Sequence, residues 1–153
     1  MTERSITHAT FVVERTYPVS PARVFAAWAD PAIKATWFGE AGENKSDTSE
    51  FNFRVGGREF SSGTAPDGQS FCYEARYQDI VPDQRIVYTY DMHINDARIS
   101  VSLATIELTP AGTGTRMVVT EHGAYLDGLD TPAQRQEGTQ WLMDQLGEAL
   151  TRQ

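Results

Sequence analysis

The sequence predicts one α+β domain in which a curved, seven-stranded antiparallel sheet wraps around a long C-terminal helix. Three observations lead to this prediction. Residues 131–152 carry apolar side chains at helical spacing. Most of the preceding chain consists of short runs of β-branched and aromatic residues that are separated by turn sequences. Two cap-then-proline pairs, Ser20-Pro21 and Asp30-Pro31, follow the first of these runs and predict two short helices.

The predicted strands occupy residues 10–19, 50–55, 58–64, 70–80, 85–93, 98–109 and 115–122. Residues 1–9 are polar and are predicted to be loose, and residues 39–47 are predicted to form a polar loop. Gly56-Gly57 suits the tight turn of a hairpin. Consecutive strands joined by short turns form an antiparallel meander, and a strongly twisted sheet of this size curls. The long helix can therefore fill the concave side of the sheet.

The two short helices are predicted to dock on the rest of the domain. The first presents Phe25 and Trp28 on its apolar face, and the second carries Ile33 and Trp37 before Gly39 ends it. Helices of this length are not stable alone, so tertiary packing must hold them.

The long helix is predicted to start at Thr131, whose hydroxyl can cap free amides, with Gln134 as a capping-box partner. Its apolar side is formed by Gly138, Trp141, Leu142, Leu146, Ala149 and Leu150. The same pattern places Arg135 away from that side, together with other polar residues. Gly138 and Gly147 reduce the side-chain volume of the helix, which favours a cavity beneath it.

Composition excludes several classes of function. The chain has 153 residues, with 13 basic and 21 acidic side chains and a net charge of −8. That balance argues against nucleic acid or an anionic membrane as a partner. The single Cys72 excludes an internal disulfide and a multi-cysteine zinc site, and His93 and His122 lack metal-site spacing, so we expect no metal and no other cofactor. Without a membrane-spanning run or signal peptide, residues 1–153 are predicted to be one cytoplasmic domain.

Short stretches along nearly the whole chain carry a family resemblance. They are residues 16–25, 30–39, 55–60, 80–88, 114–123 and 138–146. In this order they resemble the helix-grip fold of the START/Bet v 1-like (SRPBCC) superfamily, and within it the Hsp90-ATPase-activator-homologue (AHSA1-like) family. The resemblance implies a cavity between the long helix and the curved sheet that holds lipids, steroids, polyketides or other hydrophobic molecules. A minority of the superfamily are cyclases, dehydratases or hydroxylase components.

The predicted ligand-binding residues are mainly aromatic and are expected to line that cavity. They are Trp28, Trp37, Phe51, Phe53, Tyr73, Tyr88, Tyr90, Met92, Glu121, Tyr125, Trp141 and Leu142. Apolar rings with a few hydroxyl groups are typical of a ligand pocket, but the same rings could instead form a packed core. Trp141 is expected to be buried on the apolar side of the long helix.

Glu121 is the most informative polar residue of the sequence. By strand alternation it shares an inward face with Met117 and Val119. A carboxylate there must be paired, or its pKa must rise through desolvation, and it could then orient a ligand or act as an acid or base. Alternatively, Glu121 reaches solvent at the strand end or bonds to a tyrosine hydroxyl. No residue is assigned as catalytic on this basis.

The sequence therefore predicts a protein that binds a hydrophobic small molecule or lipid-like ligand. One alternative is a cyclase- or dehydratase-type enzyme that uses Glu121 and a tyrosine. The other is a co-chaperone-like protein-interaction module. An inward cluster of ionisable groups would favour the enzyme, and a large exposed apolar patch would favour the module. Whether the chain forms a homodimer is left open.

Overall fold

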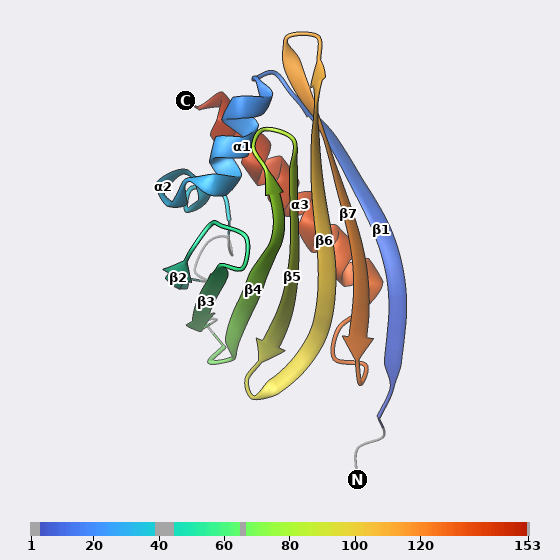
Figure 1. Cartoon of the computed structure of the whole chain (residues 1–153). Coiled ribbons are helices and arrows are strands. Elements are labelled where there is room, and N and C mark those ends of the chain that lie inside the picture. The colour runs from blue at the N-terminus through green and yellow to red at the C-terminus, as the bar shows by residue number, and fades with distance from the viewer. Residues whose placement is uncertain (1–3, 39–44, 65–66, 153) are drawn as a thin grey trace.

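The computed structural model describes residues 4–38, 45–64 and 67–152, and the side chains of these residues except 45–49. Within these ranges the chain forms one sheet and three helices (Figure 1). The elements are β1 (Ile6–Tyr17), α1 (Pro21–Ala29), α2 (Pro31–Lys34), β2 (Lys45–Phe51), β3 (Arg58–Thr64), β4 (Ser70–Val81), β5 (Arg85–Ile94), β6 (Ala97–Ala111), β7 (Gly114–Leu126) and α3 (Pro132–Thr151). The predicted order of elements is confirmed.

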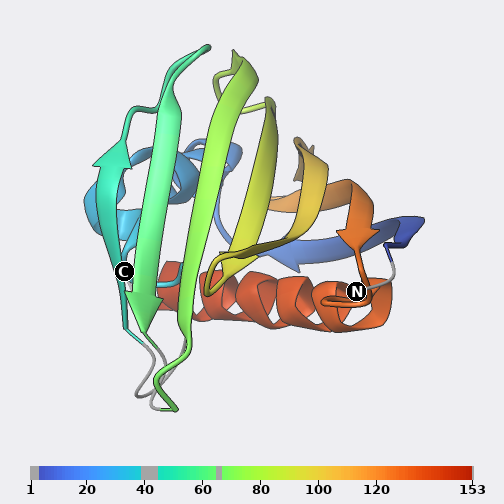
Figure 2. The ribbon, with the colours of Figure 1, turned by 90° about the horizontal axis from the view of Figure 1, so that it is seen from below.

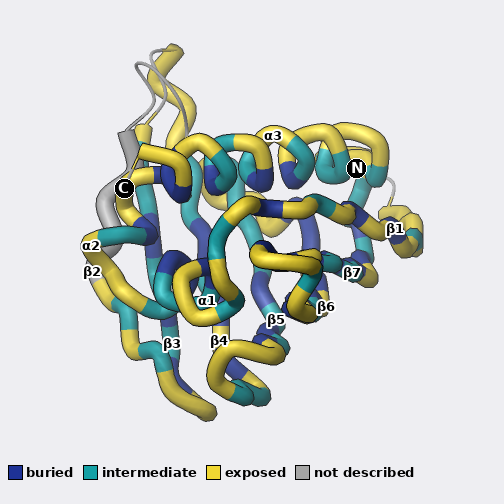
Figure 3. The backbone as a smooth tube through the Cα atoms, turned by 90° about the horizontal axis from the view of Figure 1, so that it is seen from above, coloured by how far each residue is buried: buried dark blue, intermediate teal, exposed yellow. Residues whose placement is uncertain are grey.

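The seven strands form one antiparallel sheet in the order β1-β7-β6-β5-β4-β3-β2. The sheet is curved, and α3 lies across its open side (Figure 2). Buried stretches lie on α1, on α3 and along the strands (Figure 3). None of the helices in the described part of the chain is long and apolar enough to cross a membrane.

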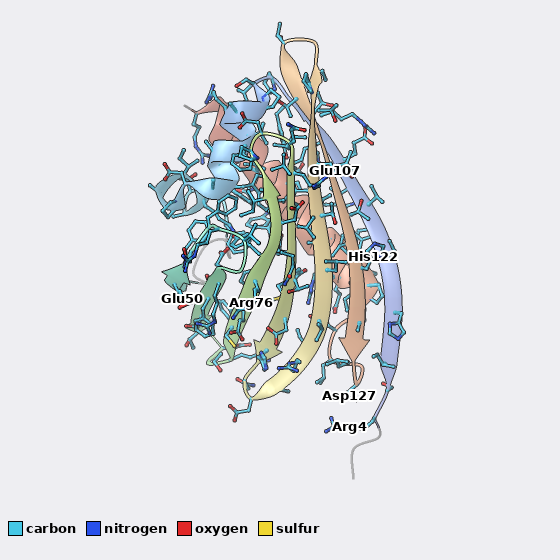
Figure 4. The ribbon with its side chains drawn as sticks, in the orientation of Figure 1. Arg4, Glu50, Arg76, Glu107, His122 and Asp127 are labelled. Carbon is cyan, nitrogen blue, oxygen red and sulfur yellow. The ribbon has the colours of Figure 1, made fainter. Side chains whose placement is uncertain are left out.

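The first strand begins earlier than predicted. Residues 6–9 were expected to be loose, but they pair with β7 in a register that joins Ile6 to Leu126. Arg4, just before β1, forms an ion pair of 2.8 Å with Asp127, just after β7 (Figure 4). Backbone hydrogen bonds to a neighbouring strand do not depend on apolar side chains, so the polar sequence did not reveal this pairing.

The prediction for the second strand was wrong. The strand lies at Lys45–Phe51 rather than at residues 50–55. After it the backbone turns, with the Gly57 amide donating to the Arg54 carbonyl over 2.7 Å. Gly56 has a φ of 83°, a conformation that glycine adopts without strain. The glycine pair therefore closes a longer turn than the predicted hairpin.

The short helices dock through their tryptophans. Asp30 caps α2, as its carboxylate accepts from the Ala32 amide over 2.9 Å. The helix ends at Lys34, so the predicted extension to Trp37 is wrong, and Gly39 lies outside the described residues. Trp37 sits in the following turn and donates from Nε1 to the Ala27 carbonyl of α1 over 2.9 Å. This bond fastens α2 and the turn to α1.

The long helix is fixed to the rest of the domain along its C-terminal half. The Tyr17 hydroxyl of β1 donates to the Met143 carbonyl over 2.7 Å, and Arg23 of α1 donates to the Leu150 carbonyl over 3.0 Å. The buried residues of α3 are Thr139, Met143, Leu146, Ala149 and Leu150. Trp141 is 38% exposed, which corrects the expectation that it is buried. The reason is that residues two apart on a helix lie on nearly opposite sides, and Trp141 is two residues from both of the buried residues Thr139 and Met143.

The two glycines of α3 give a matched test of this packing. A Cβ at Gly138 would meet no atom within 4 Å, whereas a Cβ at Gly147 would lie 3.1 Å from the Tyr17 ring. We therefore expect Gly138→Ala to stabilise the protein by about 0.5–1 kcal/mol, because alanine loses less backbone entropy in a helix. Gly147→Ala should gain less or destabilise. Urea unfolding of both variants measures the difference, and an equal gain at both positions would contradict the described contact with Tyr17.

Candidate functional site

A cavity of about 250 Å³ lies between the N-terminal half of α3 and the curved sheet. Many of its lining residues were predicted from the sequence. These are Trp28, Tyr73, Tyr88, Tyr90, Met92, Glu121, Trp141 and Leu142. Further apolar residues complete the wall, namely Phe38, Phe71, Val119 and Met143. The interior is thus mainly aromatic and aliphatic, and the lining also includes the exposed residues Gln134, Gly138 and Trp141 of α3.

Four predicted residues do not line this cavity. Trp37 lies behind Trp28, with ring centroids 4.8 Å apart. Phe51 and Phe53 pack on the Tyr77 ring instead, with centroid distances of 6.4 Å and 4.9 Å. Strand alternation finds the inward face correctly, but it does not reveal which inward rings are covered by others.

Tyr125 is the fourth predicted residue outside the lining. Its ring packs over Gly123, where an added Cβ would lie 2.7 Å from the tyrosine hydroxyl oxygen. The Arg135 guanidinium lies 5.7 Å from the centre of the same ring. Tyr125 therefore supports the polar end of the cavity from behind.

The polar end of the cavity is a connected group that we call the Arg135 cluster: Tyr90, Ser100, Glu121, Asp130 and Arg135. The Tyr90 hydroxyl donates to Glu121 Oε1 through a short hydrogen bond. Arg135 donates from Nη1 to the Tyr90 hydroxyl over 3.0 Å and from Nη2 to Ser100 Oγ over 2.8 Å. Nη2 also forms a short ion pair with Asp130. One guanidinium thus joins the helix, the sheet and the segment before the helix.

Burial and neighbouring groups shift the pKa values of Glu121 and Tyr90 in the Arg135 cluster. Glu121 is only 3% exposed, and burial raises the pKa of its carboxyl above the ordinary value. The hydrogen bond from Tyr90 and the charge of Arg135, whose Nη1 lies 3.9 Å from Oε1, oppose that shift. Burial, followed by the charge of Glu121, raises the pKa of Tyr90 well above its usual value. The predicted alternative in which Glu121 bonds to a tyrosine hydroxyl describes this geometry.

The position of Arg135 corrects the prediction that it points away from the sheet. Its side chain is 10% exposed and lines the cavity. The helical repeat contains a signal for this, since Arg135 precedes Leu142 by seven residues and Leu146 by eleven, close to two and three turns. Arg135 was assigned to the polar side because it is charged. Its partners Tyr90 and Ser100 lie far away in the sequence, so the local pattern did not indicate them.

A second buried polar cluster lies behind the aromatic wall and was not predicted. Lys34 Nζ of α2 lies 2.7 Å from Glu59 Oε1 of β3, and the Tyr77 hydroxyl of β4 donates to the same oxygen over 2.6 Å. Lys34 and Glu59 are only 5% and 1% exposed. Burial lowers the pKa of the Lys34 ammonium, and the adjacent Glu59 carboxylate opposes the change.

Aromatic rings separate this ion pair from the cavity. Lys34 Nζ lies 4.4 Å from the centre of the Phe38 ring and 5.8 Å from that of Trp28, and both rings line the cavity. A buried ammonium among aromatic faces is stabilised by their quadrupoles as well as by its carboxylate partner. The pair therefore holds α2 and the aromatic wall to β3.

The histidines take no part in the cavity wall. The Nδ1 atom of His122 lies 2.8 Å from the Thr10 hydroxyl oxygen, and His122 is exposed. Within residues 4–38, 45–64 and 67–152, no group of three or more His, Cys, Asp or Glu side chains could hold a metal ion.

Comparisons with known proteins agree with this architecture. The family model for Activator of Hsp90 ATPase homolog 1-like proteins matches residues 18–151. The structure of an uncharacterized protein from Rhizobium leguminosarum has a TM-score of 0.90 and 39% sequence identity, and the match covers 99% of this chain and 100% of that one. The Mll3558 protein from Rhizobium loti has a TM-score of 0.84 and 47% identity, with coverages of 95% and 99%. A search among curated proteins found no match.

A more distant solved structure has the same fold. Protein CV1439 from Chromobacterium violaceum has a TM-score of 0.80 and 27% identity, and the match covers 92% of this chain and 96% of that one. The helix-grip fold expected from the sequence is confirmed, as is the resemblance that suggested it.

Breaking the buried ion pair should strongly destabilise the protein. In Lys34→Met the Glu59 carboxylate stays buried without its ammonium partner, so we expect a loss of about 3–5 kcal/mol in the free energy of unfolding. The double variant Lys34→Met/Glu59→Gln removes both charges and keeps an acceptor for Tyr77, so it should recover most of that loss. Urea unfolding of the single and double variants measures both values. Additive losses would show that the two side chains do not depend on each other.

Glu121 should make the stability of the protein depend on pH. Its raised pKa means that the folded chain binds this proton more tightly than the unfolded chain, in which the pKa is near the ordinary 4.5. The wild type should therefore lose stability relative to Glu121→Gln as the pH rises above that value and through the folded pKa. Unfolding at several values between about pH 4 and pH 8 measures the difference. The exposed Glu137→Gln is the control, and a difference that grows in the opposite direction would refute the assignment.

Proposed function

Because the chain belongs to the Activator of Hsp90 ATPase homolog 1-like family, whose fold commonly binds hydrophobic ligands, we propose that it binds a hydrophobic small molecule in the cavity beneath α3. The observation that carries this proposal is a mainly aromatic cavity whose described lining has one connected group of charged side chains, at one end. A space lined in this way suits a ligand that is apolar over most of its surface and has one polar group.

Apolar burial supplies most of the affinity in this proposal. Each Å² of apolar surface removed from water contributes about 25 cal/mol. A volume of about 250 Å³ lies just below the roughly 300–1,000 Å³ of most ligand sites, so the ligand is small. The hydroxyls of Tyr73 and Tyr88 are within hydrogen-bonding reach of each other and can orient it.

The ligand enters beside α3 in this proposal. Gly138 and Trp141 line the cavity and are exposed, and α3 is tied to β1 and α1 mainly farther along, at Met143 and Leu150. Absence of a side chain at Gly138 leaves the passage open, and the Trp141 ring can cover part of a bound molecule.

The first experiment is native mass spectrometry of the purified protein, followed by organic extraction and identification of whatever is released. We expect a mass above that of the chain alone, or a rise in melting temperature with small aromatic compounds, because ligands that bind only the folded state stabilise it. A protein that carries nothing, and that no apolar compound stabilises, would contradict the proposal.

A matched pair of variants tests whether the ligand binds in the cavity. Gly138→Leu adds a side chain to the cavity wall, whereas Ala133→Leu adds a similar side chain to an exposed position of α3 outside the lining. We expect Gly138→Leu to weaken binding by about tenfold or more, because the leucine side chain fills space in which the ligand would bury its apolar surface. Ala133→Leu should bind like the wild type. Calorimetric titration measures both, and equal affinities would place the ligand elsewhere.

An acid–base enzyme of the cyclase or dehydratase type is the second candidate. It is favoured by the buried Glu121 carboxyl with its raised pKa, because such groups are suited to proton transfer when they face a substrate. Incubation of the extracted ligand with fresh protein separates the two functions. A binding protein returns the compound unchanged, whereas an enzyme converts it, and Glu121→Gln would then stop conversion.

A further inference from the structure

The Arg135 cluster contains more acidic than basic groups. Three charged side chains line the described part of the cavity, the acids Glu121 and Asp130 and the base Arg135. The guanidinium already donates to Asp130, Ser100 and Tyr90, and Glu121 Oε1 lies 3.9 Å away. A carboxylate or phosphate on a ligand would add a third acid to a single, already paired base.

The tyrosines of the cavity also indicate that an anionic ligand is disfavoured. Burial is the main cause that raises the pKa values of Tyr88 and Tyr90, and the charge of Glu121 is the next. An environment that disfavours a phenolate at two positions also disfavours a ligand anion placed between them.

Glu121 offers an acceptor to a neutral ligand. The Tyr90 hydroxyl and the nearest Arg135 nitrogen both approach Oε1, and the Ser102 side chain also lies within hydrogen-bonding reach of the carboxylate. A carboxylate has about four acceptor positions, so these three partners leave room for a ligand donor. A carboxylate oxygen that is held in place within an apolar cavity binds a hydroxyl donor strongly, because hydrogen bonds to charged groups exceed neutral ones in strength.

We propose that the cavity selects an uncharged, mainly aromatic or alicyclic alcohol or phenol, whose hydroxyl donates to Glu121, and rejects the carboxylic acid of the same skeleton. This inference rests on the proposed function and names the chemical class of its ligand. The apolar wall recognises the skeleton, and the Arg135 cluster discriminates between polar groups.

Three naphthalene compounds with one skeleton test the inference: 2-naphthol, 2-methoxynaphthalene and 2-naphthoate. At neutral pH the first has a neutral donor, the second has only an acceptor, and the third is an anion. Calorimetric titration of the full chain should give an affinity for 2-naphthol about tenfold or more above the other two, the scale of one hydrogen bond to a charged group.

Two variants distinguish a direct effect of Glu121 on the ligand from an effect of the overall negative charge of the protein. Glu121→Gln should narrow the preference of 2-naphthol over 2-naphthoate by about tenfold or more, since it removes an acid that faces the ligand. Glu137→Gln removes the same charge from an exposed position of α3 and should leave the preference unchanged.

The outcomes separate this inference from the proposed function. Binding of 2-naphthoate or 2-methoxynaphthalene as tightly as 2-naphthol would overturn the inference and leave a hydrophobic binding protein. An unchanged preference in Glu121→Gln would also overturn it. Failure of all three compounds to bind, together with a purified protein that holds no ligand, would overturn the proposed function itself.

Discussion

The structure depends on how α3 is held across the open side of a curved sheet. Its C-terminal half is packed and bonded to β1 and α1, where Tyr17 reaches the Met143 carbonyl and lies against Gly147. Its N-terminal half is joined to the sheet by Arg135, which donates to Tyr90 and Ser100. The long arginine side chain spans the distance between α3 and the sheet at this end, whereas shorter apolar side chains would bring the helix closer. The cavity therefore follows from the way this helix is attached.

The two buried polar clusters flank the cavity and fix the positions of the side chains that form its walls. Lys34, Glu59 and Tyr77 join α2 to β3 and β4 behind the Trp28 and Phe38 rings, while the Arg135 cluster joins α3 to β5, β6 and β7 at the other end. Burying charges costs free energy that their attraction only partly returns, so such clusters add little net stability. What they require is a defined geometry, because any displacement leaves a buried charge without its partner. The aromatic rings between them are therefore held in one arrangement.

Much of the fold could be predicted from the sequence because local patterns encode it. Alternation placed β3 correctly at both ends, and the Thr131 cap marked the start of α3. The ends of β1 and the position of β2 could not be found in this way, since backbone pairing with a distant strand decides them. For the site, alternation correctly assigned Tyr88, Tyr90 and Glu121 to the inward face. It could not distinguish cavity-lining rings from rings such as Phe53, which other rings cover. Nor could it predict that Arg135 lies close to Glu121.

The sequence missed the buried charges for a physical reason that also bears on function. Lysine, glutamate and arginine are almost always exposed, so a charged residue in a periodic pattern is assigned to the solvent side. Lys34 and Glu59 are exceptions because they pair with each other across two elements, and Arg135 is one because it reaches Tyr90 and Ser100 of the sheet. Partners so distant in sequence cannot be seen in a local pattern. Of these, only Arg135 lines the cavity; Lys34 and Glu59 are sealed behind rings. The first pair fixes the wall, whereas Arg135 belongs to the group of charged side chains that would face a ligand in the proposed binding mode.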